Sequence, residues 1–187
     1  FGTFTPNETL TDPLTALVVE KAPAVKKVAI LSRNDLLPLS LANALREGIK
    51  RHKLDLVYDE KFAIGSMDFA APQRQLRAAA PDWVFVGGYI NDLIQVRTQM
   101  KELGVKPTVL TMIAGPAYQE FISALKDAAE NVSSASWWHP SARYDGEDMF
   151  GSTQKFVEAF QAMYGGETPD YAEASASAVG AILLISI

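Results

Sequence analysis

The feature that most constrains this chain is a repeated alternation of short apolar runs with longer segments of helical pattern. Three runs, 26–32, 83–88 and 108–113, are apolar and rich in β-branched residues, which is typical of strands buried within a sheet. The run 55–62 is more polar and is predicted at an edge, and 132–138 is a weaker fifth strand. Because helices alternate with the strands, we expect right-handed crossovers and parallel pairing. The pattern predicts an α/β fold: a three-layer, doubly wound, mainly parallel sheet of about five strands.

The segments between these runs carry apolar residues at helical spacing. Leu41, Leu45 and Ile49 recur every four residues, which places them on one face of a helix. The further helices are predicted over residues 10–21, 70–79 and 117–127, from Leu93 to Leu103, and from Phe156 to Tyr164.

Composition narrows the class of protein. A length of 187 residues favours one domain and a fraction of another. The net charge of −5 is unfavourable for binding nucleic acid. The chain has no cysteine, which excludes a disulfide framework, a thiolate metal site and a cysteine nucleophile. Absence of cysteine suits an exported bacterial protein, and it also suits many cytosolic ones.

The two ends predict that the chain is a piece of a longer protein. It begins at Phe1 without a methionine and without the pattern of a signal peptide. It stops on the apolar run 181–187, which has no glycine or basic turn to end a helix. The alternative is a terminal helix that docks on its own core.

Motifs for catalysis or cofactor binding are missing from the sequence. There is no glycine fingerprint for a dinucleotide, no phosphate-binding loop and no serine nucleophile elbow. Neither His52 nor His139 has a ligand-like neighbour at helical spacing, so we expect no metal site. The expectation is a protein that is not an enzyme and has no cofactor. The loops 112–116 and 139–151 are rich in turn residues and are candidates for function.

In open α/β sheets, ligands lie beyond the carboxyl ends of the strands. At those ends the sequence places Gly88, Tyr89 and Trp137, which together resemble a pocket rim. Tyr89 equally fits a role in capping the following helix. Arg33 fits an anion ligand, although a solvated loop arginine is the commoner case. One of Trp137 and Trp138 is expected to pack under a helix.

The order of several segments resembles a known family, the type I periplasmic solute-binding proteins of ABC importers, in their leucine/isoleucine/valine-binding branch. The segments that carry the resemblance are 26–31, 67–70, 81–89, 100–106, 128–132, 156–160, 164–165 and 169–172.

The resemblance implies one lobe of a two-lobe clamshell, here the C-terminal lobe. Residues 1–5 would be a crossover strand from the missing lobe, 6–170 the ligand-binding lobe, and 171–187 a return segment into the missing lobe. The implied partners are a small solute, the N-terminal lobe of the same protein and an ABC permease complex, and the implied location is the periplasm.

The resemblance also transfers individual site residues. Tyr89 matches the tyrosine with which the family contacts its ligand. Leu37 replaces the family's aromatic residue, and the acid that holds a ligand ammonium falls on Ile113 or Ala114. Asp92 is the nearest acid that could substitute, and helix capping explains it equally well. Since a buried ammonium needs a partner, an apolar carboxylate or an aromatic compound fits better than an ordinary amino acid.

Three functions follow for comparison. The leading one is a solute-binding lobe for ABC import. A second is the sensory module of a receptor with the same clamshell fold. A third is a flavodoxin-like enzyme that lacks the usual fingerprints.

Overall fold

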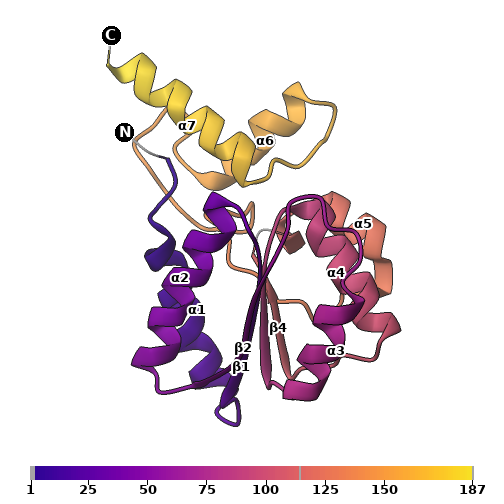
Figure 1. Ribbon diagram of the computed structural model, residues 1–187. Coiled ribbons are helices and arrows are strands. Elements are labelled where there is room, and N and C mark those ends of the chain that lie inside the picture. Colours follow the sequence, from indigo (N-terminus) through magenta and orange to yellow (C-terminus); the bar gives the residue numbers. More distant parts are fainter. Residues whose placement is uncertain (1–2, 114, 187) are drawn as a thin grey trace. The chain divides into compact units, whose positions relative to one another are not determined.

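The computed structural model describes residues 3–113 and 115–186, which divide into two compact units (Figure 1). We call residues 6–135 the sheet unit, and residues 3–5 together with 136–186 the helical unit. The sheet unit contains α1 (Asn7–Lys21), β1 (Lys27–Arg33), α2 (Leu36–Arg51), β2 (Asp55–Phe62), α3 (Ala70–Ala79), β3 (Trp83–Gly87), α4 (Ile90–Glu102), β4 (Val109–Met112) and α5 (Gln119–Leu125), with short 3-10 helices at Gly115–Ala117 and Lys126–Ala129. The helical unit contains α6 (Thr153–Met163) and α7 (Tyr171–Ile185).

The sheet has four parallel strands in the order β2-β1-β3-β4. The polar run 55–62 is β2 and lies at an edge, as its composition predicts. The two interior strands, β1 and β3, pair from Val28 opposite Trp83 to Ser32 opposite Gly87. This order confirms the doubly wound α/β fold, because the chain moves outward from β1 in both directions.

Helices cover both faces of the sheet, with α1 and α2 on one side and α3, α4 and α5 on the other (Figure 1). The second side holds a continuous core in which Val84, Val86, Leu93, Met100 and Phe121 have no exposed surface. Side chains of alternate residues on β3 point to opposite faces, so the all-apolar strand supplies both halves of the core.

A chain of polar groups links β3 to β4. The indole Nε1 of Trp83, a fully buried side chain, donates to Thr111 Oγ1 at 3.0 Å. Thr111 Oγ1 lies 2.8 Å from Ser133 Oγ, which donates to the Leu110 carbonyl at 2.9 Å. The indole N–H therefore has the partner that a buried donor requires.

The predicted fifth strand is reduced to a single parallel bridge between Thr111 and Ser133. Beyond it, Ser134 Oγ donates to the Ala135 carbonyl and Ser136 Oγ to the Trp138 carbonyl. Serine hydroxyls that bond to nearby backbone compete with a strand ladder. The described sheet therefore has four strands, and the weaker fifth strand is present only as this bridge.

The helical unit joins both ends of the described chain. Phe4, Trp137 and Tyr171 form an aromatic cluster with ring centroids 5.1–5.8 Å apart. Trp137 Nε1 also donates to the Thr5 carbonyl at 3.3 Å. Residues 3–5 form no regular element, and residues 1 and 2 lie outside the described residues, so the crossover strand stays a prediction.

Helix α7 has no buried residue, and its last turns expose Leu183, Leu184 and Ile185. It covers most of the predicted return segment 171–187, of which Ile187 lies outside the described residues. None of the described helices has the length and apolar character that crossing a membrane would need.

Candidate functional site

The carboxyl ends of the parallel strands open on one edge of the sheet unit. There β1 ends at Arg33, β3 leads into Gly88 and Tyr89, and β4 leads into Ile113. A Cβ atom at Gly88 would lie 3.1 Å from Asp92 Cβ, so a glycine permits the close approach of this turn to α4. The edge is therefore a junction of strand ends and helix starts, where α/β proteins bind ligands.

Tyr89 is both a helix cap and an exposed ring. It occupies the N-cap of α4, and its backbone N–H donates to Asp92 Oδ2 at 3.0 Å. The backbone bond uses none of the ring, and 43% of the surface of the residue is exposed. The two interpretations of Tyr89 are therefore compatible: its backbone caps the helix, and its side chain is available at the edge.

Arg33 is tied into this corner by three contacts. Its Nη1 donates to both carboxylate oxygens of Asp92, at 3.0 and 3.2 Å. Its Nε lies 3.4 Å from Asp35 Oδ2, and its guanidinium carbon lies 4.9 Å from the centroid of the Tyr89 ring. A guanidinium over a tyrosine face is a cation–π contact. The interpretation of Arg33 as a solvated loop residue is therefore wrong.

Both charges of the pair are largely out of water, with side chains exposed by 19% for Arg33 and 7% for Asp92. The hydrogen bonds to Asp92, more than the nearby charges, raise the pKa of Arg33. The guanidinium stays charged at every physiological pH. The corner holds a permanent internal ion pair.

The other predicted site residues do not all lie at this edge. Leu37, in the first turn of α2, is half-buried, and Ile113 is buried at 2% exposure; both belong to the same edge as Gly88 and Tyr89. Ala114 lies outside the described residues. Trp137 belongs to the helical unit, where it packs on Phe4 and Tyr171.

Sequence reasoning missed the pairing of Arg33 with Asp92, which are 59 positions apart. The available signal was positional: Arg33 ends one interior strand, and Asp92 follows the end of the other within a few residues. Opposite charges at the ends of neighbouring parallel strands are close in space.

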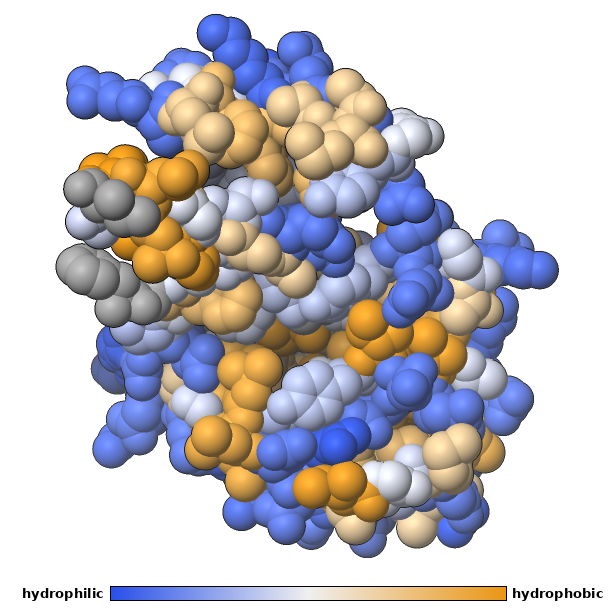
Figure 2. Space-filling view, turned by 90° about the horizontal axis from the view of Figure 1, so that it is seen from above, coloured by the Kyte–Doolittle hydropathy of each residue, from blue (hydrophilic) through white to orange (hydrophobic). Residues whose placement is uncertain are grey.

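Exposed apolar side chains also mark the strand ends. The face shown in Figure 2 carries several apolar patches separated by polar side chains. In the sheet unit, Leu36 follows β1, and Ile64 and Met67 follow β2, with 85%, 62% and 67% of their surfaces exposed. Together with Tyr89 they give the carboxyl edge an apolar character.

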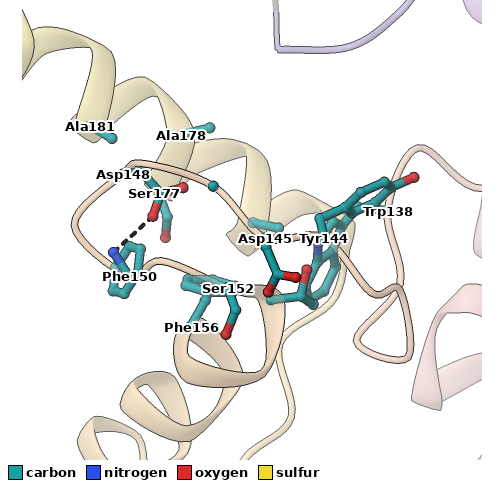
Figure 3. Close-up of a pocket in the computed structure, with 13 residues that line it drawn as sticks. Trp138, Tyr144, Asp145, Asp148, Phe150, Ser152, Phe156, Ser177, Ala178 and Ala181 are labelled. Atoms are coloured by element: carbon teal, nitrogen blue, oxygen red, sulfur yellow. Dashed lines mark hydrogen bonds between the residues drawn. The ribbon is translucent and has the colours of Figure 1, made fainter.

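A second candidate is a cavity of about 240 Å³ within the helical unit. Figure 3 shows the aromatic side chains of the loop and of α6 below α7, which contributes Ser177, Ala178 and Ala181. Phe156 packs against Trp138 and Phe150, with centroids 5.7 and 5.1 Å away. The predicted functional loop 139–151 forms part of this wall.

One of the two acids that line this cavity, Asp148, bonds to the loop itself. Asp148 Oδ1 accepts the backbone N–H groups of Phe150 and Gly151 at 2.8 and 2.9 Å. Across the described ranges, no group of three or more histidine or acidic side chains is arranged to hold a metal ion. The cavity is an aromatic-walled space whose polar groups shape a turn.

Comparison with known proteins assigns the family. The family model described as "Periplasmic binding protein" matches residues 1–185. The chain belongs to the periplasmic binding protein family. Members of this family are solute-binding proteins and not enzymes, which agrees with the expectation from the missing catalytic motifs.

Two curated relatives of this periplasmic binding protein are Leu/Ile/Val-binding proteins. The one from Citrobacter freundii is 26% identical over 62% of this chain and 30% of its own length. The one from Escherichia coli (strain K12) is 24% identical over 64% of this chain and 32% of its own length. The matches therefore span about a third of these relatives.

Solved structures show the same fold. A leucine-, isoleucine-, valine-, threonine- and alanine-binding protein from Brucella ovis, in a closed conformation, has a TM-score of 0.79 and 19% identity, over 94% of this chain and 43% of that one. A leucine-binding protein from Thermotoga maritima has a TM-score of 0.75 and 18% identity, over 90% and 46%. The sheet unit thus has the architecture of one lobe of a periplasmic binding protein.

Proposed function

We propose that this chain is the ligand-binding lobe of an extracytoplasmic, periplasmic subunit that delivers a small solute to an ABC importer. The observation that carries the proposal is the family match, which extends over residues 1–185. The exposed ring of Tyr89 at the carboxyl edge of the sheet supports it, because this edge is where open α/β sheets bind ligands.

The mechanism is non-covalent enclosure. A solute would rest on the edge formed by Gly88, Tyr89, Leu37 and Ile113 until the N-terminal lobe of the same protein closes over it. Hinge closure is the established motion of such two-lobe binders. Closure removes apolar surface from water on both sides, and that burial supplies the binding free energy.

The solute class follows from the surface at this edge. The rim offers an aromatic ring and exposed aliphatic side chains, Leu36 among them. We infer a small carboxylate-bearing, apolar or aromatic solute of the size of an amino acid. Residues 1–5 and 171–187 are the proposed connections to the missing lobe, and 6–170 the binding lobe.

The test is a thermal-shift screen of the full-length protein against amino acids, their deaminated analogues and aromatic acids. A ligand at 100 times its Kd stabilises the folded state by about 2.7 kcal/mol, which is a shift of several degrees. Absence of a shift with every solute would refute transport binding.

Two tyrosine variants locate the site. Tyr89→Ala should raise the Kd of the solute by roughly 10-fold or more, since it removes an aromatic wall of the site. Tyr144→Ala is the matched control, because Tyr144 is an exposed tyrosine of the other cavity. A loss of binding confined to Tyr144→Ala would move the site to the helical unit.

A further inference from the structure

The acids at the carboxyl edge differ in burial. Four acidic side chains follow the strands in a loop or first helical turn, namely Asp35, Asp68, Asp92 and Glu120. Asp68 and Glu120 are exposed, Asp35 is half-buried, and Asp92 alone is buried. An enclosed ammonium group needs a desolvated anion beside it, so Asp92 is the acid placed to hold one.

Both oxygens of Asp92 are already occupied. Oδ1 accepts from Arg33 Nη1 at 3.2 Å. Oδ2 accepts from Arg33 Nη1 and from the Tyr89 backbone N–H, each at 3.0 Å. The charge of Asp92 is neutralised within the chain, and the strongest bonds that it can make are made.

Asp35 is engaged in part. Its Oδ1 accepts the backbone N–H of Leu36 at 2.7 Å, as the N-cap of α2, and its Oδ2 faces Arg33 Nε at 3.4 Å. Asp68 Oδ1 accepts the backbone N–H of Ala70 at 2.8 Å. Asp92, the buried acid among the described residues of this edge, therefore has both oxygens engaged within the chain, whereas Asp35 keeps an oxygen that contacts Arg33 without a hydrogen bond.

Arg33 also covers one face of the Tyr89 ring. The guanidinium lies over the ring at 4.9 Å, so this face is unavailable to a cation of the ligand. Tyr89 still exposes 43% of its surface. An uncharged, flat or aliphatic group can lie against it without displacing an ion.

We propose that Arg33 is a specificity-determining residue that occupies the place of a ligand ammonium beside Asp92 and Tyr89, so that this lobe selects solutes without an amino group. The proposal rests on the proposed solute-binding function and names the class of its solute: an acid or neutral compound with an apolar or aromatic body. Glu120, which is exposed, does not take part in this selection against an amino group.

The experiment measures Kd for matched pairs that differ only at the ammonium group, using the full-length protein and calorimetry. The pairs are leucine with 4-methyl-2-oxopentanoate, and phenylalanine with phenylpyruvate. The wild type should bind the oxo acid of a pair at least about 10-fold more tightly, the value of one charge-assisted hydrogen bond. If the thermal screen identifies another solute, that solute is compared with its amine-bearing analogue.

Variants assign the selectivity to Arg33. Arg33→Gln frees Asp92 and should move the ratio of Kd values by about 10-fold or more toward the amine, whereas Arg33→Lys should keep the wild-type preference. Arg46→Gln is the matched control, because it breaks an arginine–aspartate pair with Asp59 on the outer part of the sheet unit. It should leave the ratio unchanged.

Arg33→Gln can fail to fold, because an unpaired buried carboxylate is costly. Asp92→Asn then replaces it: because Asp92 no longer neutralises the charge of Arg33, the preference for the oxo acid should grow. A wild type that prefers the amine, or a ratio that neither variant changes, overturns the assignment of Arg33 and leaves the solute-binding function standing. Failure to bind any solute refutes the function itself.

Discussion

The polar chain from Trp83 to Ser133 gives a quantitative prediction for Thr111→Val. Valine keeps the β-branched shape of threonine and replaces the hydroxyl with a methyl group. Trp83 Nε1 loses the acceptor at 3.0 Å, and its side chain has no exposed surface through which water could take over. Ser133 keeps its bond to the Leu110 carbonyl at 2.9 Å, so the indole N–H is the group left unpaired.

The magnitude follows from that single donor. A buried polar group without a partner costs about 1–3 kcal/mol, and the methyl group that valine adds offsets only part of that cost. We expect a loss of about 2 kcal/mol in the free energy of unfolding. For a chain of this size, that is a decrease of roughly 4–8 °C in Tm.

The assay is urea unfolding followed by far-UV circular dichroism, with the midpoint compared at constant slope. Thr108→Val is the control, since Thr108 is exposed, and it should change stability by less than about 0.5 kcal/mol. In a double-mutant cycle, Trp83→Phe and Thr111→Val should show a coupling energy of about 1 kcal/mol. A Thr111→Val protein as stable as the control would refute the reasoning.

Two further predictions concern the helical unit. Phe156→Ala removes the ring that Trp138 and Phe150 contact and should destabilise this unit by about 3 kcal/mol, measured by tryptophan fluorescence in urea; an unchanged transition contradicts it. Burial raises the pKa of Asp170, the N-cap of α7, to about 6, so the folded state holds a proton that the unfolded state releases between about pH 4 and 6. Stability of α7 should therefore fall as pH rises through that window, and Asp170→Asn should flatten the slope in melts followed by circular dichroism; a wild-type slope of opposite sign is the contrary result. Glu173, whose pKa the hydrogen bond with Asp170 lowers, acts in the opposite sense at pH values below the ordinary pKa of a glutamate.

The sequence predicts regular elements well where one local rule dominates. The helix over 70–79 is found with the same bounds as α3, and the polar run 55–62 is the edge strand. The helix predicted from residue 10 begins instead at Asn7. Its N-cap is Pro6, whose fixed φ prepares the first turn without contributing to the apolar pattern.

The parts that the sequence did not predict depend on distant partners. The sequence predicts Trp137 at the rim because it lies near the carboxyl end of the predicted strand 132–138, but only one bridge of that strand forms and the ring packs with Phe4. The partner of Arg33 lies on another helix, and no local pattern distinguishes a paired arginine from a hydrated one. Local periodicity reports which face is buried, whereas the pairing of charges requires the topology.

The aromatic cluster of the helical unit has a consequence for how the chain is made. Trp137 reaches back to the Thr5 carbonyl across 132 positions, so during synthesis residues 3–5 emerge before the entire sheet unit but find their partners only after it. Closing a loop of that length costs roughly 4 kcal/mol in chain entropy. A sheet unit that has already folded shortens the effective loop. The docking of Phe4 should therefore be a late folding step, which takes place only after the sheet unit has folded.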